Sequence, residues 1–81
     1  MTTLSQIRLA GTRTRRVSSG YYEVSTPADP SLKVTIDRRD DLGGWMAIAS
    51  WDRNLYTDVV PTKAAAKFNA INMIESAASA A

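Results

Sequence analysis

Residues 32–37, Leu-Lys-Val-Thr-Ile-Asp, carry the most regular pattern in the chain. Leu32, Val34 and Ile36 alternate with polar residues, which is the two-residue period of a strand that buries one face. This stretch therefore predicts a β-strand whose apolar side chains pack on a core. Turn-forming residues lie on both sides of it, so neighbouring strands are expected to fold back against it in an antiparallel meander.

Further strands are predicted before and after this stretch. Residues 21–24 are expected to lie in a strand whose first residue is near Val17. Residues 27–30 are expected to form the loop that follows this strand. Residues 45–51 have apolar residues on both faces, which predicts a central strand covered on each side. After a tight turn, residues 55–60 are expected to add a short strand. Together, these stretches predict a sheet of three to four strands.

A helix is predicted after the last strand. Thr62 is a suitable N-cap, and the helix is expected to run from about residue 63 to residue 78. Apolar residues recur at three- and four-residue spacing, and we expect the stripe that they form to face the sheet: Ala64, Phe68, Ile71, Ile74 and Ala78. The predicted fold class is therefore α+β, with an antiparallel meander packed on one C-terminal helix.

The N-terminal segment has two interpretations. Residues 3–6, Thr-Leu-Ser-Gln, match a capping box and favour a short helix, whereas Ile7-Arg8-Leu9 alternates as a strand does. Gly11 and the alternation of Thr and Arg after it do not sustain a helix. We therefore expect residues 1–20 to form a basic arm or edge strand, and residues 21–81 to form a single domain.

The composition excludes several kinds of chemistry. The 81 residues include no cysteine and no histidine, so disulfides, the usual zinc sites and Ser-His or Cys-His nucleophiles are ruled out. Asp37, Asp40 and Asp41 fall close together, but their spacing is not that of a calcium loop, and a polar turn is the favoured interpretation. No phosphate-binding loop is present. We expect no enzymatic activity, no metal and no cofactor.

Charge is unevenly distributed along the chain. Residues 1–20 contain Arg8, Arg13, Arg15 and Arg16 and no acid, a net charge of +4. Residues 21–81 contain six basic and eight acidic side chains, a net charge of −2. Guanidinium groups pair with phosphate or carboxylate, so these arginines are candidate contacts for an anionic partner. The alternative is a solvated terminus without a binding role.

The start of the predicted helix resembles a known family. Residues 61–70, Pro-Thr-Lys-Ala-Ala-Ala-Lys-Phe-Asn-Ala, follow a meander and are similar to the last third of a double-stranded-RNA-binding domain. The resemblance implies that Lys63 and Lys67 contact phosphates across a groove of the nucleic acid. The alternative is that both lysines solubilise a helix whose other face is buried.

The aromatic residues also have two interpretations. Trp45, Trp51 and Tyr56 suit either a platform for stacking bases or, as we favour for the tryptophans, the core of a short sheet. Tyr21 and Tyr22 are adjacent, so on a strand their side chains point to opposite faces. One of the two is expected to pack and the other to lie exposed at an interface, and Tyr21 is our candidate for the exposed one.

The overall size and composition resemble the small accessory proteins of bacterial viruses, such as inhibitors of CRISPR complexes. That resemblance implies a cytoplasmic protein that binds a protein or nucleoprotein complex of a bacterial host. Direct binding of double-stranded RNA or DNA is the second hypothesis, and a structural or assembly subunit is the third. The chain has no apolar run of the roughly 20 residues that span a bilayer, so we expect no membrane partner. We expect a monomer or a homodimer.

Overall fold

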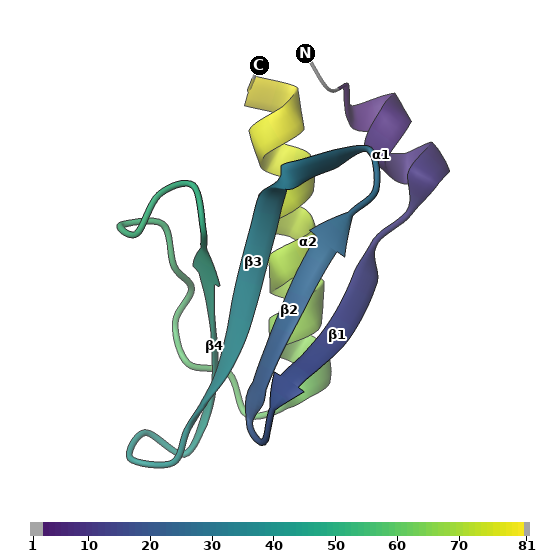
Figure 1. The fold of residues 1–81 in the computed structure, drawn as a ribbon. Coiled ribbons are helices and arrows are strands. Elements are labelled where there is room, and N and C mark those ends of the chain that lie inside the picture. The colour runs from purple at the N-terminus through teal and green to yellow at the C-terminus, as the bar shows by residue number, and fades with distance from the viewer. Residues whose placement is uncertain (1–2, 81) are drawn as a thin grey trace.

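The computed structural model describes residues 3–80. The chain forms an N-terminal helix, four strands and a C-terminal helix: α1 (Leu4–Ala10), β1 (Arg13–Ser18), β2 (Tyr21–Thr26), β3 (Asp29–Arg39), β4 (Gly44–Ala49) and α2 (Lys63–Ala80). The strands pair antiparallel in chain order, and α2 lies across one face of the sheet (Figure 1). This arrangement confirms the predicted α+β fold, an antiparallel meander packed on a C-terminal helix.

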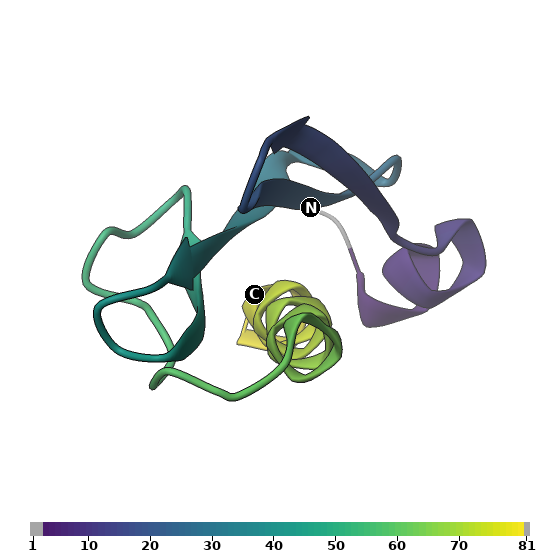
Figure 2. The ribbon, with the colours of Figure 1, turned by 90° about the horizontal axis from the view of Figure 1, so that it is seen from below.

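The sheet curves around α2, which lies on its concave side (Figure 2). We call this face of the sheet the inner face and the opposite one the outer face. Val24, Val34 and Ile36 point to the inner face from β2 and β3 and are fully buried. The alternation of Leu32, Val34 and Ile36 therefore predicted the correct buried face, although Leu32 is only half-buried.

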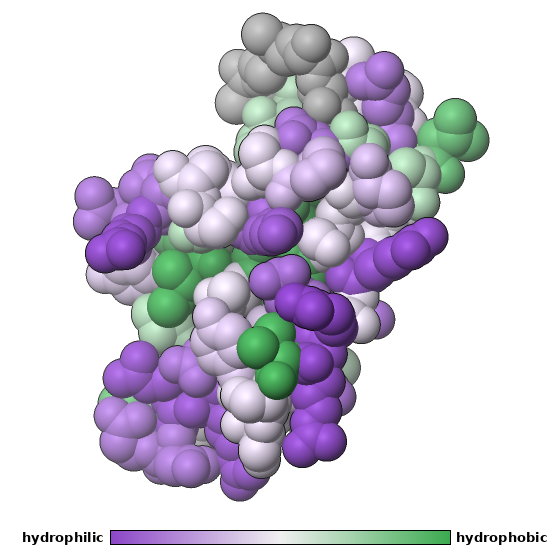
Figure 3. Space-filling model, in the orientation of Figure 1, coloured by the Kyte–Doolittle hydropathy of each residue, from purple (hydrophilic) through white to green (hydrophobic). Residues whose placement is uncertain are grey.

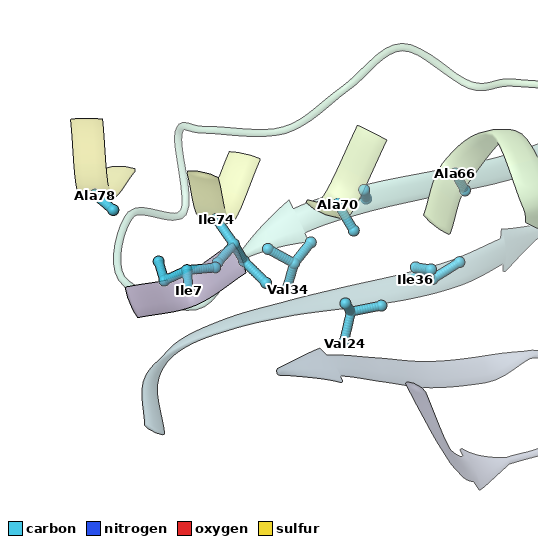
Figure 4. Close-up of a cluster of buried hydrophobic side chains, with 9 residues drawn as sticks. Ile7, Val24, Val34, Ile36, Ala66, Ala70, Ile74 and Ala78 are labelled. Carbon is cyan, nitrogen blue, oxygen red and sulfur yellow. The ribbon is translucent and has the colours of Figure 1, made fainter. Parts of the chain in front are cut away.

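The core is a single cluster between the inner face and the two helices. Figure 4 shows Ile74 of α2 reaching between Ile7 of α1 and Val34 of β3. Ala66 and Ala70 are fully buried on α2, and their small side chains allow the helix to lie close to the strands. The half-buried Trp45 and Trp51 pack against the edge of this cluster, as do six others: Tyr22, Ala28, Leu32, Val60, Ile71 and Met73.

The buried face of α2 matches the predicted stripe only in part: Ile74 and Ala78 are buried and Ile71 is half-buried, but Ala64 and Phe68 lie outside the buried face. Ala66, Ala70, Ile74 and Ala78 form the buried stripe at four-residue spacing, whereas Ala64 is exposed and the Phe68 side chain is 65% exposed. The prediction followed the three- and four-residue spacing of apolar residues, which includes Phe68. Apolar residues surround this helix on nearly every side, so their period alone does not select a face, and the close approach to the sheet favours alanine.

The N-terminal arm is not confirmed, because residues 4–10 form helix α1. Thr3 Oγ1 accepts a hydrogen bond from the Gln6 N–H at 3.2 Å, and the Thr3 N–H donates to Gln6 Oε1 at 2.8 Å. This is the capping box that the sequence contains. Ile7 is buried against α2, so tertiary packing decides in favour of the helix. Gly11, with φ +79°, ends it.

The edge strands also differ in part from the prediction. Residues 13–18 form β1, which agrees with the edge-strand alternative for the N-terminal segment. Residues 55–60 do not form a regular strand. They run along β4 and make only two isolated bridges, Trp45 to Val60 and Ile48 to Tyr56. The bridges still cover the free edge of β4, and the edge of β1 has no comparable cover among the described residues.

We expect Ile74→Ala to lower the free energy of unfolding by about 2–5 kcal/mol, because it removes a fully buried side chain from the centre of the core. Phe68→Ala is the matched control. It removes an exposed side chain, so the change should stay within about 0.5 kcal/mol. Urea unfolding followed by tryptophan fluorescence measures both. Equal losses for the two variants would contradict the face assigned to α2.

We expect Gly44→Ala to lower the free energy of unfolding by about 1–3 kcal/mol through overpacking. A methyl group on Gly44 would collide with the Val60 carbonyl oxygen and lie 2.6 Å from Val59 Cγ1. The double variant Gly44→Ala, Val59→Ala should recover only part of the loss, since the Val60 carbonyl is backbone. Full stability of Gly44→Ala in thermal unfolding would show that residues 59–60 do not pack tightly on β4.

Candidate anionic-ligand surface

The strand register places Arg16 on the inner face of the sheet. Arg16 lies directly opposite Tyr22, and Tyr22 lies opposite the buried Ile36. Residues directly opposite each other in an antiparallel pair point to the same face. Because α2 packs on β2, β3 and β4 and leaves β1 uncovered, the inner side of β1 is exposed and Arg16 is exposed with it.

The first residue of α2 contacts the same tyrosine. Lys63 Nζ lies 4.3 Å from the centroid of the Tyr22 ring, which is the geometry of a cation–π contact. The Tyr22 ring is held in turn by Trp45 of β4, at 6.0 Å between ring centroids and an interplanar angle of 53°. The half-buried Tyr22 therefore has Arg16 on one side and Lys63 above it.

Lys67 extends this arrangement along α2. It lies four residues after Lys63, so the two lysines are neighbours on the helix surface, and both are exposed. The helix begins beside them: the Ala65 N–H donates to Thr62 Oγ1 at 3.1 Å, which makes Thr62 the N-cap, as predicted. The positive end of the helix dipole adds to the local potential. We call Arg16, Lys63 and Lys67 the basic cluster: Arg16 and Lys63 lie beside Tyr22, and Lys67 lies one helical turn further along α2.

Several carboxylates pair with arginines outside the basic cluster or lie on the outer face of the sheet. The ion pairs among the described residues join four arginines to acids, and none involves the basic cluster: Arg8–Glu75 at 3.3 Å, Arg15–Glu23 at 3.7 Å, Arg38–Asp40 at 2.9 Å and Arg39–Asp41 at 3.5 Å. Glu23 and Asp37 point to the outer face, because each directly follows a residue of the inner face, Tyr22 and Ile36 respectively. The basic cluster thus has no neutralising acid within 4.0 Å among residues 3–80.

The other predicted site residues lie apart from the basic cluster. Arg8 is on α1 and pairs with Glu75 of α2. Arg13 and Arg15 are on the outer side of β1, because they alternate with Thr14 and Arg16. Tyr21 also points to the outer face and is 37% exposed. Figure 3 looks onto this outer face, where hydrophilic residues follow the side of the molecule on which β1 lies.

The structure adds one residue that the sequence analysis did not select. Tyr22 contacts Lys63 and Trp45 and lies opposite Arg16, so it lies between two of the three cations of the basic cluster. Its packed position agrees with the expectation that one of the two adjacent tyrosines packs while Tyr21 is exposed. Its contact with Lys63 was not predicted, because it joins residues that are far apart in the sequence.

Two hollows flank the sheet and α2 outside the basic cluster. One, of about 480 Å³, is mainly apolar and lies between α2 and residues 51–57, with Trp51, Leu55 and Met73 in its wall. The other, of about 510 Å³, lies at the β3–β4 turn and contains the Arg38–Asp40 pair. No group of three or more metal-binding side chains occurs in the described part of the chain. The wall of the first hollow contains no titratable side chain, and that of the second contains Arg38 and Asp40.

Comparisons with known proteins found no similar protein. The chain matches no protein-family model, and searches of curated proteins and of solved structures gave no significant match. Among the helices of residues 3–80, none is both long enough and apolar enough to cross a membrane.

We expect the triple variant Arg13→Ala, Arg15→Ala, Arg16→Ala to unfold at nearly the same denaturant concentration as the parent protein. All three side chains are exposed, and within residues 3–80 Arg15 alone of the three forms an ion pair, at 3.7 Å. Each change should cost within about 0.5 kcal/mol. Urea titration followed by circular dichroism measures the total change in the free energy of unfolding. A loss of several kcal/mol would show that β1 depends on its arginines for folding.

Proposed function

We propose that the protein is a non-enzymatic binding protein that docks on a nucleoprotein complex, with the basic cluster in contact with phosphate groups of its nucleic acid. One observation carries the proposal: Arg16 and Lys63 come from distant parts of the chain to one surface, with Lys67 next along the helix, and no acid among residues 3–80 pairs with them within 4.0 Å. A guanidinium fork and two ammonium groups are suited to phosphate oxygens.

The surrounding acids favour a nucleoprotein over free nucleic acid. Glu23 and Asp37 lie on the outer face of the strands that carry Tyr22 and Ile36, and Asp40 and Asp41 lie in the β3–β4 turn. Asp37, which forms no ion pair among the described residues, repels a long polyanion that extends past the basic cluster. The pairing of Glu23, Asp40 and Asp41 with arginines reduces their repulsion without removing it. A protein surface can instead use both signs of charge, for steering and for register. Three cations also suit a few phosphates better than an extended duplex.

The resemblance to accessory proteins of bacterial viruses extends the proposal to its biological setting. In that setting the complex belongs to the host, the protein acts in the host cytoplasm, and docking inhibits or regulates the complex. The similarity of residues 61–70 to double-stranded-RNA-binding domains supports phosphate contacts by Lys63 and Lys67, and it stays a prediction.

We expect weak binding to a free 20-base-pair duplex, with Kd about 10⁻⁶ M or weaker at physiological salt and no sequence preference. Three phosphate contacts should give a slope of about −2.7 for log K against log salt. Fluorescence anisotropy with labelled DNA and RNA duplexes between 50 and 200 mM salt measures it. The variant Lys63→Gln, Lys67→Gln should reduce the slope to about −0.9, because one contact remains.

The matched control for these lysines is Lys33→Gln, Arg53→Gln, which removes the same charge from residues outside the basic cluster. Its salt slope should equal that of the parent. Equal slopes for both double variants would contradict phosphate contact at the basic cluster. Nanomolar, sequence-selective binding of a bare duplex would replace docking on a complex by direct nucleic-acid recognition.

Affinity capture from bacterial host lysate, with and without nuclease, tests the docking itself. We expect the parent protein to retain protein partners in both samples and to retain fewer of them after nuclease treatment. The Lys63→Gln, Lys67→Gln variant should retain the nuclease-resistant set only. Loss of every partner on nuclease treatment would favour nucleic acid as the sole ligand, and no difference between the samples would favour a protein surface without nucleic acid.

A further inference from the structure

The strand β1 forms an open edge of the sheet. It pairs with β2 on one side, no described strand lies on the other, and all six of its residues are exposed (Figures 1 and 2). In an antiparallel strand, alternate residues direct their N–H and C=O groups to either side. The outer edge of β1 therefore presents backbone donors and acceptors that an additional strand can pair with.

A second copy of the chain does not fit this edge well. Antiparallel pairing of β1 with itself requires a two-fold axis, and an axis anywhere between Thr14 and Arg16 places an arginine of one copy directly opposite an arginine of the other. Like charges directly opposite each other are destabilising. The arginines therefore protect the edge against self-association, as charged residues on edge strands do.

The same arginines select an acidic strand. On the β2 side, Glu23 lies directly opposite Arg15 and forms an ion pair with it at 3.7 Å. An added strand on the other side can repeat that cross-strand pair with carboxylates of its own. Arg13 has no ion-pair partner within the described residues, so it is available to a first carboxylate.

We propose that the open edge of β1 accepts an extended acidic segment of a partner protein as a fifth strand of the sheet. Backbone hydrogen bonds to β1 supply the affinity, and carboxylates at alternate positions, opposite Arg13 and Arg15, supply the specificity. Arg13 and Arg15 lie on the outer side of β1, away from the basic cluster. The edge can therefore hold its peptide whether or not the basic cluster binds phosphate.

The test uses a defined peptide of eight residues in which Glu and Val alternate, with both ends capped. A matched peptide has two central Val residues replaced by Pro, which keeps the charge and prevents strand pairing. We expect the first peptide to bind at least tenfold more tightly in fluorescence anisotropy. By NMR, it should slow amide hydrogen exchange at alternate residues of β1 and leave α2 unchanged.

Charge variants separate the edge from the basic cluster. Arg13→Gln, Arg15→Gln should weaken binding of the Glu-Val peptide at least tenfold, with unfolding midpoints confirming that the variant is folded. Lys63→Gln, Lys67→Gln should change it less than twofold, although it lowers the salt slope for a duplex. Failure of the duplex experiment therefore leaves the edge proposal intact, and failure of the peptide experiment leaves the phosphate proposal intact.

Four outcomes would overturn the proposal. Absence of peptide binding would show that the edge is not a docking site. Equal binding of the Pro-containing peptide would show that charge attraction, and not strand pairing, holds the peptide. Concentration-dependent dimerisation through β1 in sedimentation, without peptide, would make a second copy the occupant. Displacement of the peptide by a duplex, with duplex binding lost on Arg13→Gln, Arg15→Gln, would make nucleic acid the occupant.

Discussion

The close packing of α2 on the inner face of the sheet is the contact on which the rest of the structure depends. Val24, Val34 and Ile36 point at the helix from two central strands, and Ile74 enters between them and α1. Burying each such side chain contributes about 1.5–3 kcal/mol. With no cysteine in the chain, no disulfide supplements this core. Ala66 and Ala70 allow the short distance between helix and strands, so a compact core forms from few large residues.

The same packing decides which surfaces are open. A single helix covers β2, β3 and β4, and α1 adds cover beside the C-terminal half of α2 (Figure 1). β1 lies beyond the helix, so both of its faces and one edge remain exposed. Residues 55–60 cover the opposite edge at β4. The uncovered side of the sheet therefore coincides with the arginine-rich strand.

The two proposed surfaces use different properties of this uncovered strand. On its inner side, Arg16 lies opposite Tyr22, the residue whose ring Lys63 of α2 contacts. Its outer side presents Arg13 and Arg15 together with an unpaired backbone edge. A phosphate ligand needs the converging cations, whereas an added strand needs the backbone, so the two contacts are compatible on one partner complex. Because side chains alternate between the two faces of β1, the phosphate contact and the arginines that select the added strand lie on opposite faces of this strand.

The sequence by itself determined the fold class, the buried face of β3 and the helix that begins after Thr62, because these depend on a clear two-residue period and a local N-cap. It placed Ile74 and Ala78 correctly on the buried face of α2 but misplaced Ala64 and Phe68, and it did not determine whether residues 4–10 are helical. Apolar residues surround α2, so the sheet selects the alanine stripe and leaves Phe68 exposed. A helix as short as α1 needs the burial of Ile7 to form. The basic cluster likewise required the tertiary structure, because strand register and helix packing bring Arg16 and Lys63 to the same ring.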